Sequence, residues 1–229
     1  MRLAKVSTDR MMMLLGMIML GSIWGLLECT VGSLRLEVLG LSIPSGAVMA
    51  GLFGIGFMVM ARKMFNTMGI SLGVAIFAGI MRIFAPVGSC QLCAAIAIMA
   101  EGLIFEFFVN RKVIMGSLFG KRKDYRTLVF SGIIAGFTIY SSGYIITQFL
   151  TPFVVQGEII PLSEVWSILP LIFGRGFFAA VLGGISIPAI ASLDLERLKM
   201  TEIKKAPFYA VSSLISAICW LTMVTVVVL

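Results

Sequence analysis

Seven long apolar stretches set the strongest limit on what this chain can become. A helix needs about 20 apolar residues to cross the hydrocarbon layer of a membrane, with a range of about 17 to 25. By this measure the candidate spans are residues 11–34, 45–61, 70–87, 90–109, 127–150, 166–192 and 207–229. Only 13% of the 229 residues are charged, whereas a soluble protein has about 25%. The chain is therefore expected to be an integral protein of the lipid bilayer.

The number of spans depends on the middle of the chain. The second and third stretches are the shortest, and the linker around Pro86 is tight enough for stretches three and four to form one re-entrant feature. The sequence thus predicts an all-α, polytopic transmembrane helix bundle with six to seven spans. No shift in composition marks a second domain, so residues 1–229 are taken as a single integral membrane domain. Its core bundle covers about residues 10–195, and an extra C-terminal span covers about 207–229.

The basic residues lie in alternate loops, which gives an expected orientation. Fifteen of the 18 Lys and Arg residues precede the first span or follow the second, fourth and sixth. Because cytoplasmic loops carry an excess of Lys and Arg, the N-terminus is expected in the cytoplasm. The GSCQLC segment, residues 88–93, is then on the outer side of a cytoplasmic (plasma) membrane. This arrangement accounts for the net charge of +7 without a nucleic-acid partner.

Two absences in the sequence restrict the chemistry. The chain has no histidine, which excludes His-based zinc and haem sites and leaves carboxylates and thiolates as the main side-chain metal ligands. It also lacks the GxxxxGK[ST] motif of P-loop ATPases. We therefore expect no cofactor, and any energy that the chain uses has to come from a gradient, a redox partner or another subunit.

Five ionisable residues fall inside the expected spans, where a charge costs a few kcal/mol unless it meets a partner, a cavity or water. At about 1.5 Å of rise per residue, Glu28 and Arg82 lie at one level near the outer ends of their helices. Glu101 and Arg175 lie deeper and are predicted to form a second, buried charge pair. Each pair suits either a structural lock between helices or a binding site.

The fifth intramembrane charge is Glu106, near the inner end of the fourth stretch. Arg111 and Lys112 follow it closely in the sequence. Glu106 is therefore interpreted as an ordinary carboxylate at the membrane interface.

The outer half of the expected bundle is polar for a membrane protein. A pocket for a small polar or amphipathic molecule needs aromatic side chains together with a few polar groups of both charge signs. Residues of these kinds share one depth and are predicted to form a substrate-binding site: Trp24, Glu28, Arg82, Cys90, Gln91, Cys93, Tyr140 and Tyr144. Interfacial anchoring is the simpler role of Trp and Tyr, but Trp24 and Tyr140 are set below the interface.

Small residues form two stripes in the spans. One is Gly21-S-I-W-Gly25 in the first span, and the other is AAVLGGISIPAI, residues 179–190, near the end of the sixth. Such stripes let helices approach closely, either within the bundle or against another membrane protein. Together with a basic-inside bundle of about six helices and a polar outer half, they resemble the substrate-binding S components of energy-coupling factor (ECF) vitamin and metal transporters. The resemblance covers roughly residues 10–195.

This resemblance implies a function and partners. The bundle would bind a small solute, a vitamin-like molecule or a metal species, from outside and would itself be no enzyme. Cytoplasmic ATPases, acting through a transmembrane coupling subunit, would drive release inward. In that family the first helix carries an alanine version of the small-residue motif and docks on the coupling subunit. Gly21 and Gly25 occupy that place and are the helix-docking residues that the resemblance implies.

The sequence leaves three other functional classes open, and two of them depend on the cysteines. A C-x-x-C such as Cys90 and Cys93 at the outer end of a helix is similar to quinone-linked disulfide-generating membrane proteins, and a helix N-terminus lowers thiol pKa. Such enzymes generally need a second exposed cysteine pair, which Cys29 and Cys219 do not supply. A soft-metal site of Cys29, Cys90 and Cys93 is another possibility, because thiolates favour Cu(I) and similar ions. The third alternative is that the chain is a structural subunit of a larger membrane complex.

Overall fold

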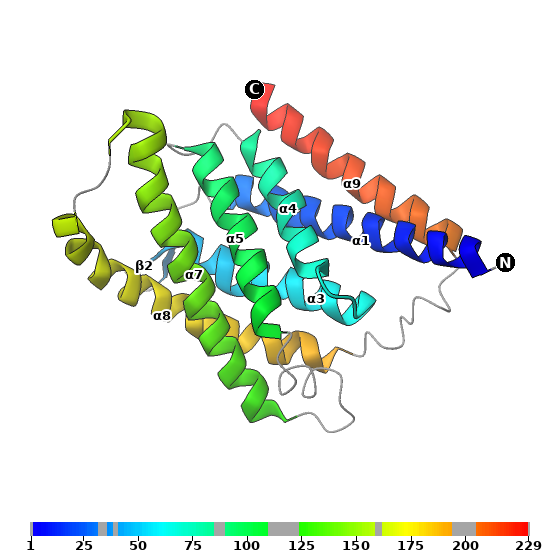
Figure 1. Ribbon diagram of the computed structural model, residues 1–229, viewed down its shortest axis with the longest axis horizontal. Coiled ribbons are helices and arrows are strands. Elements are labelled where there is room, and N and C mark those ends of the chain that lie inside the picture. The colour runs from blue at the N-terminus through cyan, green and yellow to red at the C-terminus, as the bar shows by residue number, and fades with distance from the viewer. Residues whose placement is uncertain are drawn as a thin grey trace.

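The computed structural model describes residues 2–31, 36–38, 41–84, 90–109, 124–158, 162–193 and 205–228. Almost all of these residues are helical, so the prediction of an all-α bundle is confirmed (Figure 1). The helical elements are α1 (Arg2–Thr30), α2 (Ser45–Val48), the π-helical segment η1 (Met49–Gly54), α3 (Ile55–Phe65), α4 (Ile70–Ile83), α5 (Gln91–Val109), α7 (Tyr125–Gln156), α8 (Leu162–Ser192) and α9 (Lys205–Val228).

Six helical segments of the described residues are long and apolar enough to cross a membrane. They are Arg10–Thr30, Ser45–Phe65, Gln91–Val109, Tyr125–Gln156, Trp166–Ser192 and Lys205–Thr225. Helix α4 has 14 residues and at 1.5 Å per residue reaches only about 21 Å, short of a hydrocarbon layer about 30 Å thick. The chain is therefore an integral membrane protein, and the expected count of six to seven spans is confirmed. The linker around Pro86 lies outside the described residues.

The helices follow one another around a central segment. In the order α9, α1, α4, α5, α7 and α8, each helix packs on the next, and η1 with α3 contacts α1, α4, α7 and α8 from within (Figure 1). This enclosed position explains why Ser45–Phe65 is the most buried of the six spans. The packing order places α1, α4, α5, α7 and α8 around one space, which is where the candidate site lies.

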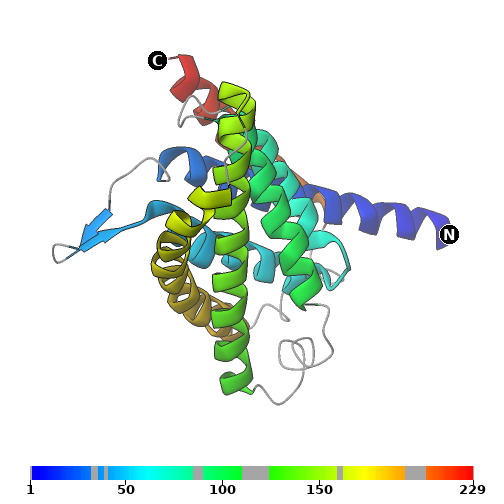
Figure 2. The same ribbon diagram turned by 60° about the vertical axis from the view of Figure 1, so that its left-hand side comes forward.

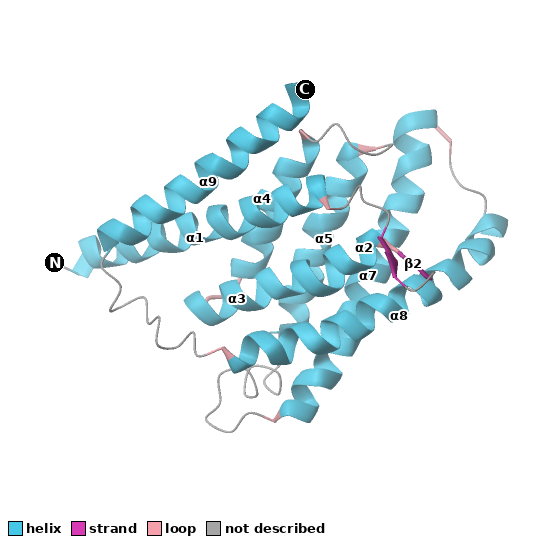
Figure 3. Cartoon of the chain, turned by 180° about the vertical axis from the view of Figure 1, so that it is seen from behind, coloured by secondary structure: helices cyan, strands magenta, loops and turns pink. Residues whose placement is uncertain are grey.

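A two-stranded antiparallel hairpin interrupts the helical pattern between α1 and α2. Strand β1 (Leu36–Val38) pairs with β2 (Leu41–Ile43), with Leu36 opposite Ile43. The hairpin extends away from the helices and returns to α2 on the side of α7 and α8 (Figures 2 and 3). It therefore leads directly into residues 44–46, which line the cavity described below.

Helices α7 and α8 touch through their backbones because glycine faces glycine or alanine. A Cβ atom on Gly132 would lie 2.2 Å from the carbonyl oxygen of Gly183, and one on Gly136 would lie 2.2 Å from that of Ala179. Small residues allow such close helix contact in membranes, where packing rather than the hydrophobic effect drives association. This contact fixes the position of the two helices that carry Tyr140, Tyr144 and Arg175.

The Gly21-x-x-x-Gly25 motif makes the same kind of contact inside the chain. A Cβ on Gly21 would lie 2.6 Å from the carbonyl oxygen of Val74, and one on Gly25 would lie 2.8 Å from Cβ of Met81. Both glycines are buried and hold α4 against α1. Their expected role in docking a separate subunit is therefore corrected to packing within the bundle.

We predict that Gly21→Ala destabilises the protein. The added methyl group meets the backbone of α4, and overpacking of this kind costs about 1–3 kcal/mol. Thermal denaturation of the purified protein measures the effect as a lower Tm. The matched control is Gly174→Ala in α8, where an added Cβ has nothing within 4 Å. Equal melting temperatures for the two variants would contradict the packing role.

The last helix, α9, lies against α1 and outside the main core (Figure 1). Trp220 Nε1 donates to Ser22 Oγ at 3.1 Å, and the ring of Trp220 meets that of Phe84 edge-on at 6.1 Å between centroids. A small separate cluster of Cys29, Met81, Cys219 and Met223 fills the contact. The extra span is thus held against α1 by the hydrogen bond between Trp220 and Ser22 and by this apolar cluster.

The end of α3 carries two buried basic residues that hold other helices. Lys63 Nζ donates to the carbonyl oxygens of Ile190, Ala191 and Leu193 at 3.2, 3.0 and 2.7 Å. The last carbonyls of a helix have no intrahelical partner, and a cation there also suits the helix dipole. Lys63 therefore closes the C-terminal end of α8.

Arg62 holds Glu106, whose predicted role as an interfacial carboxylate is wrong. Glu106 is buried and accepts hydrogen bonds from Arg62 Nη1 at 3.0 Å and from the backbone N–H groups of Gly69 and Ser71 at 2.9 and 3.2 Å. Gly69 and Ser71 lie at the start of α4, so Glu106 caps that helix from α5. The lysine and arginine expected nearby lie outside the described residues.

Candidate ligand-binding site

A cavity of about 420 Å³ lies between five helices and the N-terminal end of α2. Its volume is in the range of small-molecule sites, about 300 to 1,000 Å³. Helices α1, α4, α5, α7 and α8 all contribute to its wall. The lining residues are Glu28, Pro44, Ser45, Gly46, Arg82, Ala94, Ala97, Ile98, Glu101, Tyr140, Gly143, Tyr144, Thr147 and Arg175. Four ionisable side chains, two of each sign, therefore face one space inside a membrane protein.

Glu28 is held in place by Trp24, one turn earlier in α1. Trp24 Nε1 donates to Glu28 Oε1 at 3.3 Å. Trp24 is 0% exposed and does not line the cavity. Its ring instead lies against Gly54, where an added Cβ would meet Cζ2 at 2.8 Å. The structure thus places Trp24 behind the predicted site, as the residue that orients Glu28.

Arg82 lies in the last turn of α4 and faces both Glu28 and Cys29. Its guanidinium contacts the thiol of Cys29 and is within electrostatic range of Glu28. Among the described residues the one salt bridge is between Arg62 and Glu106, so Arg82 and Glu28 do not form one. The Nη1 atom of Arg82 is buried without a hydrogen-bond partner in the described structure.

The predicted charge pair between Glu101 and Arg175 is not formed. Arg175 is drawn to Tyr144 instead: its Nη1 donates to the Tyr144 hydroxyl at 3.5 Å, and its guanidinium carbon lies 5.5 Å from the ring centroid. Glu101 sits against Gly143, with Oε1 2.5 Å from where a Cβ on that glycine would be. Its other oxygen, Oε2, has no partner among the described residues. Both residues line the cavity, but neither neutralises the other by direct contact.

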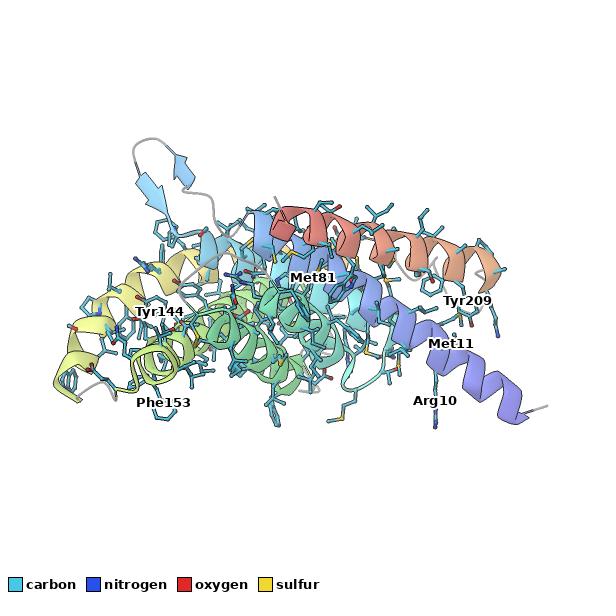
Figure 4. All side chains as sticks on the ribbon, turned by 90° about the horizontal axis from the view of Figure 1, so that it is seen from above. Arg10, Met11, Met81, Tyr144, Phe153 and Tyr209 are labelled. Carbon is cyan, nitrogen blue, oxygen red and sulfur yellow. A yellow bond between two sulfur atoms is a disulfide. The ribbon has the colours of Figure 1, made fainter. Side chains whose placement is uncertain are left out.

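Two tyrosines on one face of α7 form an aromatic wall. Tyr140 and Tyr144 are one helical turn apart, and their rings stack with centroids 5.9 Å apart and an angle of 21° between their planes. Figure 4 shows Tyr144 on the side of α7 that faces α8. Arg175 from α8 donates to the hydroxyl group of Tyr144. The aromatic surface is thus fixed by its own stacking and by a cation from the neighbouring helix.

The cysteines of the GSCQLC segment form a disulfide at the start of α5. Cys90 and Cys93 are bonded, with their Cα atoms 5.3 Å apart. Cys90 precedes the helix, and its sulfur and carbonyl oxygen accept the N–H groups of Cys93 and Ala94, each at 3.2 Å. Cys93 is 1% exposed, whereas Gln91 points outward. Neither Gln91 nor Cys93 lines the cavity, although both were predicted at the site.

A second cavity, of about 410 Å³, connects Cys90 to the first. It is lined by Arg82, Cys90, Ala94, Thr147, Gln148, Thr151 and Pro152. Arg82, Ala94 and Thr147 also line the first cavity. The two spaces therefore adjoin, and Arg82 stands at their junction.

The predicted soft-metal ligands are not assembled in the described residues. No group of three or more Cys, Asp or Glu side chains able to hold a metal is found there. Cys90 and Cys93 are joined to each other, and Cys29 is buried in the cluster with Cys219. A disulfide supplies no thiolate, and thiolate is the form that binds metal.

Some lining residues were not predicted, and helical periodicity points to two of them. Residues three and four apart share a helix face, so Gly143 and Thr147 lie on the face of α7 that carries Tyr140 and Tyr144. Residues 44–46, at the N-terminal end of α2, offered no such signal, because their position depends on the tertiary packing of α2.

Comparison of the chain with protein-family models, curated proteins and solved structures finds no match.

Proposed function

We propose that this protein is the membrane-embedded substrate-recognition subunit of an ECF-type importer and binds a small organic solute in the cavity. The observation that carries the proposal is the set of two carboxyl groups, two guanidinium groups and two stacked tyrosines on five helices around one space. Ionisable side chains are costly inside a membrane and are retained mainly where they face partners, cavities or water. A polar, aromatic cavity of this size suits a solute site.

The orientation supports import rather than export. Under the positive-inside rule the N-terminus is cytoplasmic, and Cys90 with the second cavity faces the exterior of a cytoplasmic membrane. A solute then reaches Arg82 from outside. The sequence has no P-loop, so cytoplasmic ATPases and a transmembrane coupling subunit supply the energy for release. Since Gly21 and Gly25 are covered by α4, the coupling subunit contacts another face of the bundle.

Copurification tests this proposal. The tagged chain is extracted gently from its own membranes, and mass spectrometry identifies both the copurified proteins and any small molecule released by denaturation. We expect a coupling subunit, ATPase subunits and one retained organic solute. Recovery of neither partners nor a solute would overturn the proposal.

One observation favours a second candidate, a thiol/disulfide redox protein. The Cys90–Cys93 disulfide lies at a helix N-terminus beside a cavity, a position where thiolates are stabilised. A quinone among the retained molecules would favour it over the importer.

We predict that alkylation of the unfolded, unreduced protein modifies two cysteines only, Cys29 and Cys219, because Cys90 and Cys93 are joined. Peptide mass spectrometry before and after reduction measures this. If the protein is an importer, the double variant Cys90→Ser/Cys93→Ser is expected to keep its bound solute, since neither cysteine lines the first cavity. Loss of all function in that variant, with the fold intact, would favour the redox candidate.

A further inference from the structure

We propose that the solute is a net-neutral zwitterion with a planar ring, whose cationic N–H group binds Glu101 and whose acidic group binds Arg82. This inference rests on the proposed function and names the chemical class of the substrate. It comes from the two buried polar atoms at the cavity that the protein leaves without partners, and from the aromatic surface beside them.

The first open position is an acceptor. Glu101 is 8% exposed and lines the cavity, yet its Oε2 atom has no hydrogen-bond partner among the described residues. Buried polar groups in folded proteins are nearly always hydrogen-bonded, and a buried carboxylate without a partner is especially unfavourable. A ligand that brings a charged N–H donor removes this deficit. The close contact with Gly143 keeps the carboxylate at the cavity wall.

The second open position is a donor. Arg82 Nη1 is buried and unpartnered in the described structure, although the same guanidinium contacts Cys29. A guanidinium recognises carboxylate or phosphate through paired N–H groups. Arg82 lies where the two cavities meet, and Thr147, which lines both, adds a hydroxyl group at the same junction. The acidic end of the ligand therefore lies toward the second cavity, with its other end at Glu101.

The other two charges are already engaged. Glu28 accepts a hydrogen bond from Trp24, and Arg175 is held by Tyr144. With both carboxyl groups ionised in the bound state, they balance the two guanidinium groups at this cavity. A ligand with net charge would leave an uncompensated charge in a low-dielectric site, which is strongly unfavourable. One open donor and one open acceptor in a balanced site thus select a molecule with one group of each sign.

The ring follows from the aromatic and apolar surface that lines the same cavity as the two open positions. Tyr140 and Tyr144 present stacked, immobilised rings on one side, and Ala97 and Ile98 on α5 add apolar surface to the lining. Aromatic rings prefer offset-stacked or edge-to-face contact with other rings. A planar ring carrying its charged groups at opposite ends matches this arrangement.

Four small compounds test the inference on the full-length protein in lipid nanodiscs. The zwitterionic aromatic compound is 4-(aminomethyl)benzoate. Benzylamine lacks the acid, benzoate lacks the amine, and 4-(aminomethyl)cyclohexanecarboxylate lacks the planar ring. The increase in Tm at millimolar concentration reports binding, because a molecule that binds only the folded state raises Tm. We expect the largest increase with 4-(aminomethyl)benzoate and smaller ones with the other three.

Variants assign each end of the compound. In Glu101→Gln, 4-(aminomethyl)benzoate is expected to bind no better than benzoate. In Arg82→Gln it is expected to bind no better than benzylamine. Arg82→Lys keeps the positive charge and serves if Arg82→Gln folds poorly. In Arg82→Lys we expect 4-(aminomethyl)benzoate to keep part of its advantage over benzylamine. The exposed residues Arg126 and Glu158 supply the charge-matched controls Arg126→Gln and Glu158→Gln, which are expected to behave like the wild type.

The outcomes separate this inference from the proposed function. If the purified protein retains a solute but 4-(aminomethyl)benzoate shows no advantage over the single-charge compounds, the importer proposal stands and the zwitterion is excluded. An advantage that persists unchanged in Glu101→Gln and Arg82→Gln also overturns the inference, because binding is then elsewhere. If no solute is retained and no compound raises Tm, both proposals fail.

Discussion

Replacing Arg62 with methionine is expected to cause a severe loss of stability. Arg62 and Glu106 form a salt bridge at 3.0 Å, with side chains only 5% and 7% exposed. Removing one partner of a buried pair costs about 3–5 kcal/mol, since the other charge is left uncompensated. A folded protein has a total stability of only about 5–15 kcal/mol. For a chain of this length the Tm is expected to fall by about 6 to 20 °C, measured by thermal denaturation in detergent.

The double variant Arg62→Met/Glu106→Leu is the informative control. It removes both charges, so part of the stability that Arg62→Met loses should return, as a double-mutant cycle would reveal. The recovery is incomplete, because the N–H groups of Gly69 and Ser71 also lose their acceptor. Arg126→Gln, at an exposed position, controls for loss of an arginine. A wild-type Tm in Arg62→Met would show that the pair contributes nothing.

Replacing Gly143 with valine is expected to weaken solute binding strongly while the protein stays folded. The new Cβ would lie 2.5 Å from Glu101 Oε1, so the carboxylate has to swing into the cavity. The clash is with the end of a flexible side chain, and the helices need not separate. A hydrogen bond to a charged group contributes about 1.5–3 kcal/mol, which corresponds to about a tenfold to 100-fold loss of affinity.

Mass spectrometry of the solute bound per protein molecule measures this loss. Gly174→Val is the matched control, because an added Cβ at Gly174 meets nothing within 4 Å. Size-exclusion profiles show whether both variants remain folded. Full occupancy in a folded Gly143→Val variant would place the solute away from Glu101.

The spans could be predicted because hydrophobicity and length depend on local sequence alone. The stretch 127–150, for example, lies within α7, which continues to Gln156. The stretch 70–87 was expected to be one of the two shortest spans, and α4 is shorter still, because it ends at Ile83. Helix ends depend on which groups satisfy the terminal N–H and C=O groups. At the start of α4, for example, one such group is Glu106, which lies more than 30 residues further along the chain.

The candidate site could be predicted in part. The sequence gives the depth of a residue along its helix, but it does not give the direction in which the side chain points or the neighbours of the helix. The helical rise placed Glu28, Arg82, Tyr140 and Tyr144 near one level, and the structure gathers all four at the cavity. The rise alone does not say which way a helix faces. Glu101 and Arg175 share a cavity but pair with neither each other nor a third charge.

The pairing of Glu106 also shows that a single sequence does not reveal contacts between distant segments. Arg62 precedes it by 44 residues and comes from another helix. Arg111 and Lys112 were closer in sequence, and proximity along the chain favoured them. The contact between α3, α4 and α5 that joins Arg62 to Glu106 arises from tertiary packing, which single-sequence patterns do not contain.

The contact between Lys63 and the end of α8 also has a consequence for the order of events during synthesis of the chain. Lys63 precedes its acceptor Ile190 by 127 residues, and a ribosome adds about 5–20 residues per second, so about 6 to 25 s separate their synthesis. During that interval the three carbonyl oxygens that Lys63 contacts at the end of α8 have not yet been synthesised. The hydrogen bonds that join α3 to the C-terminal end of α8 therefore form only after α8 has been synthesised in full.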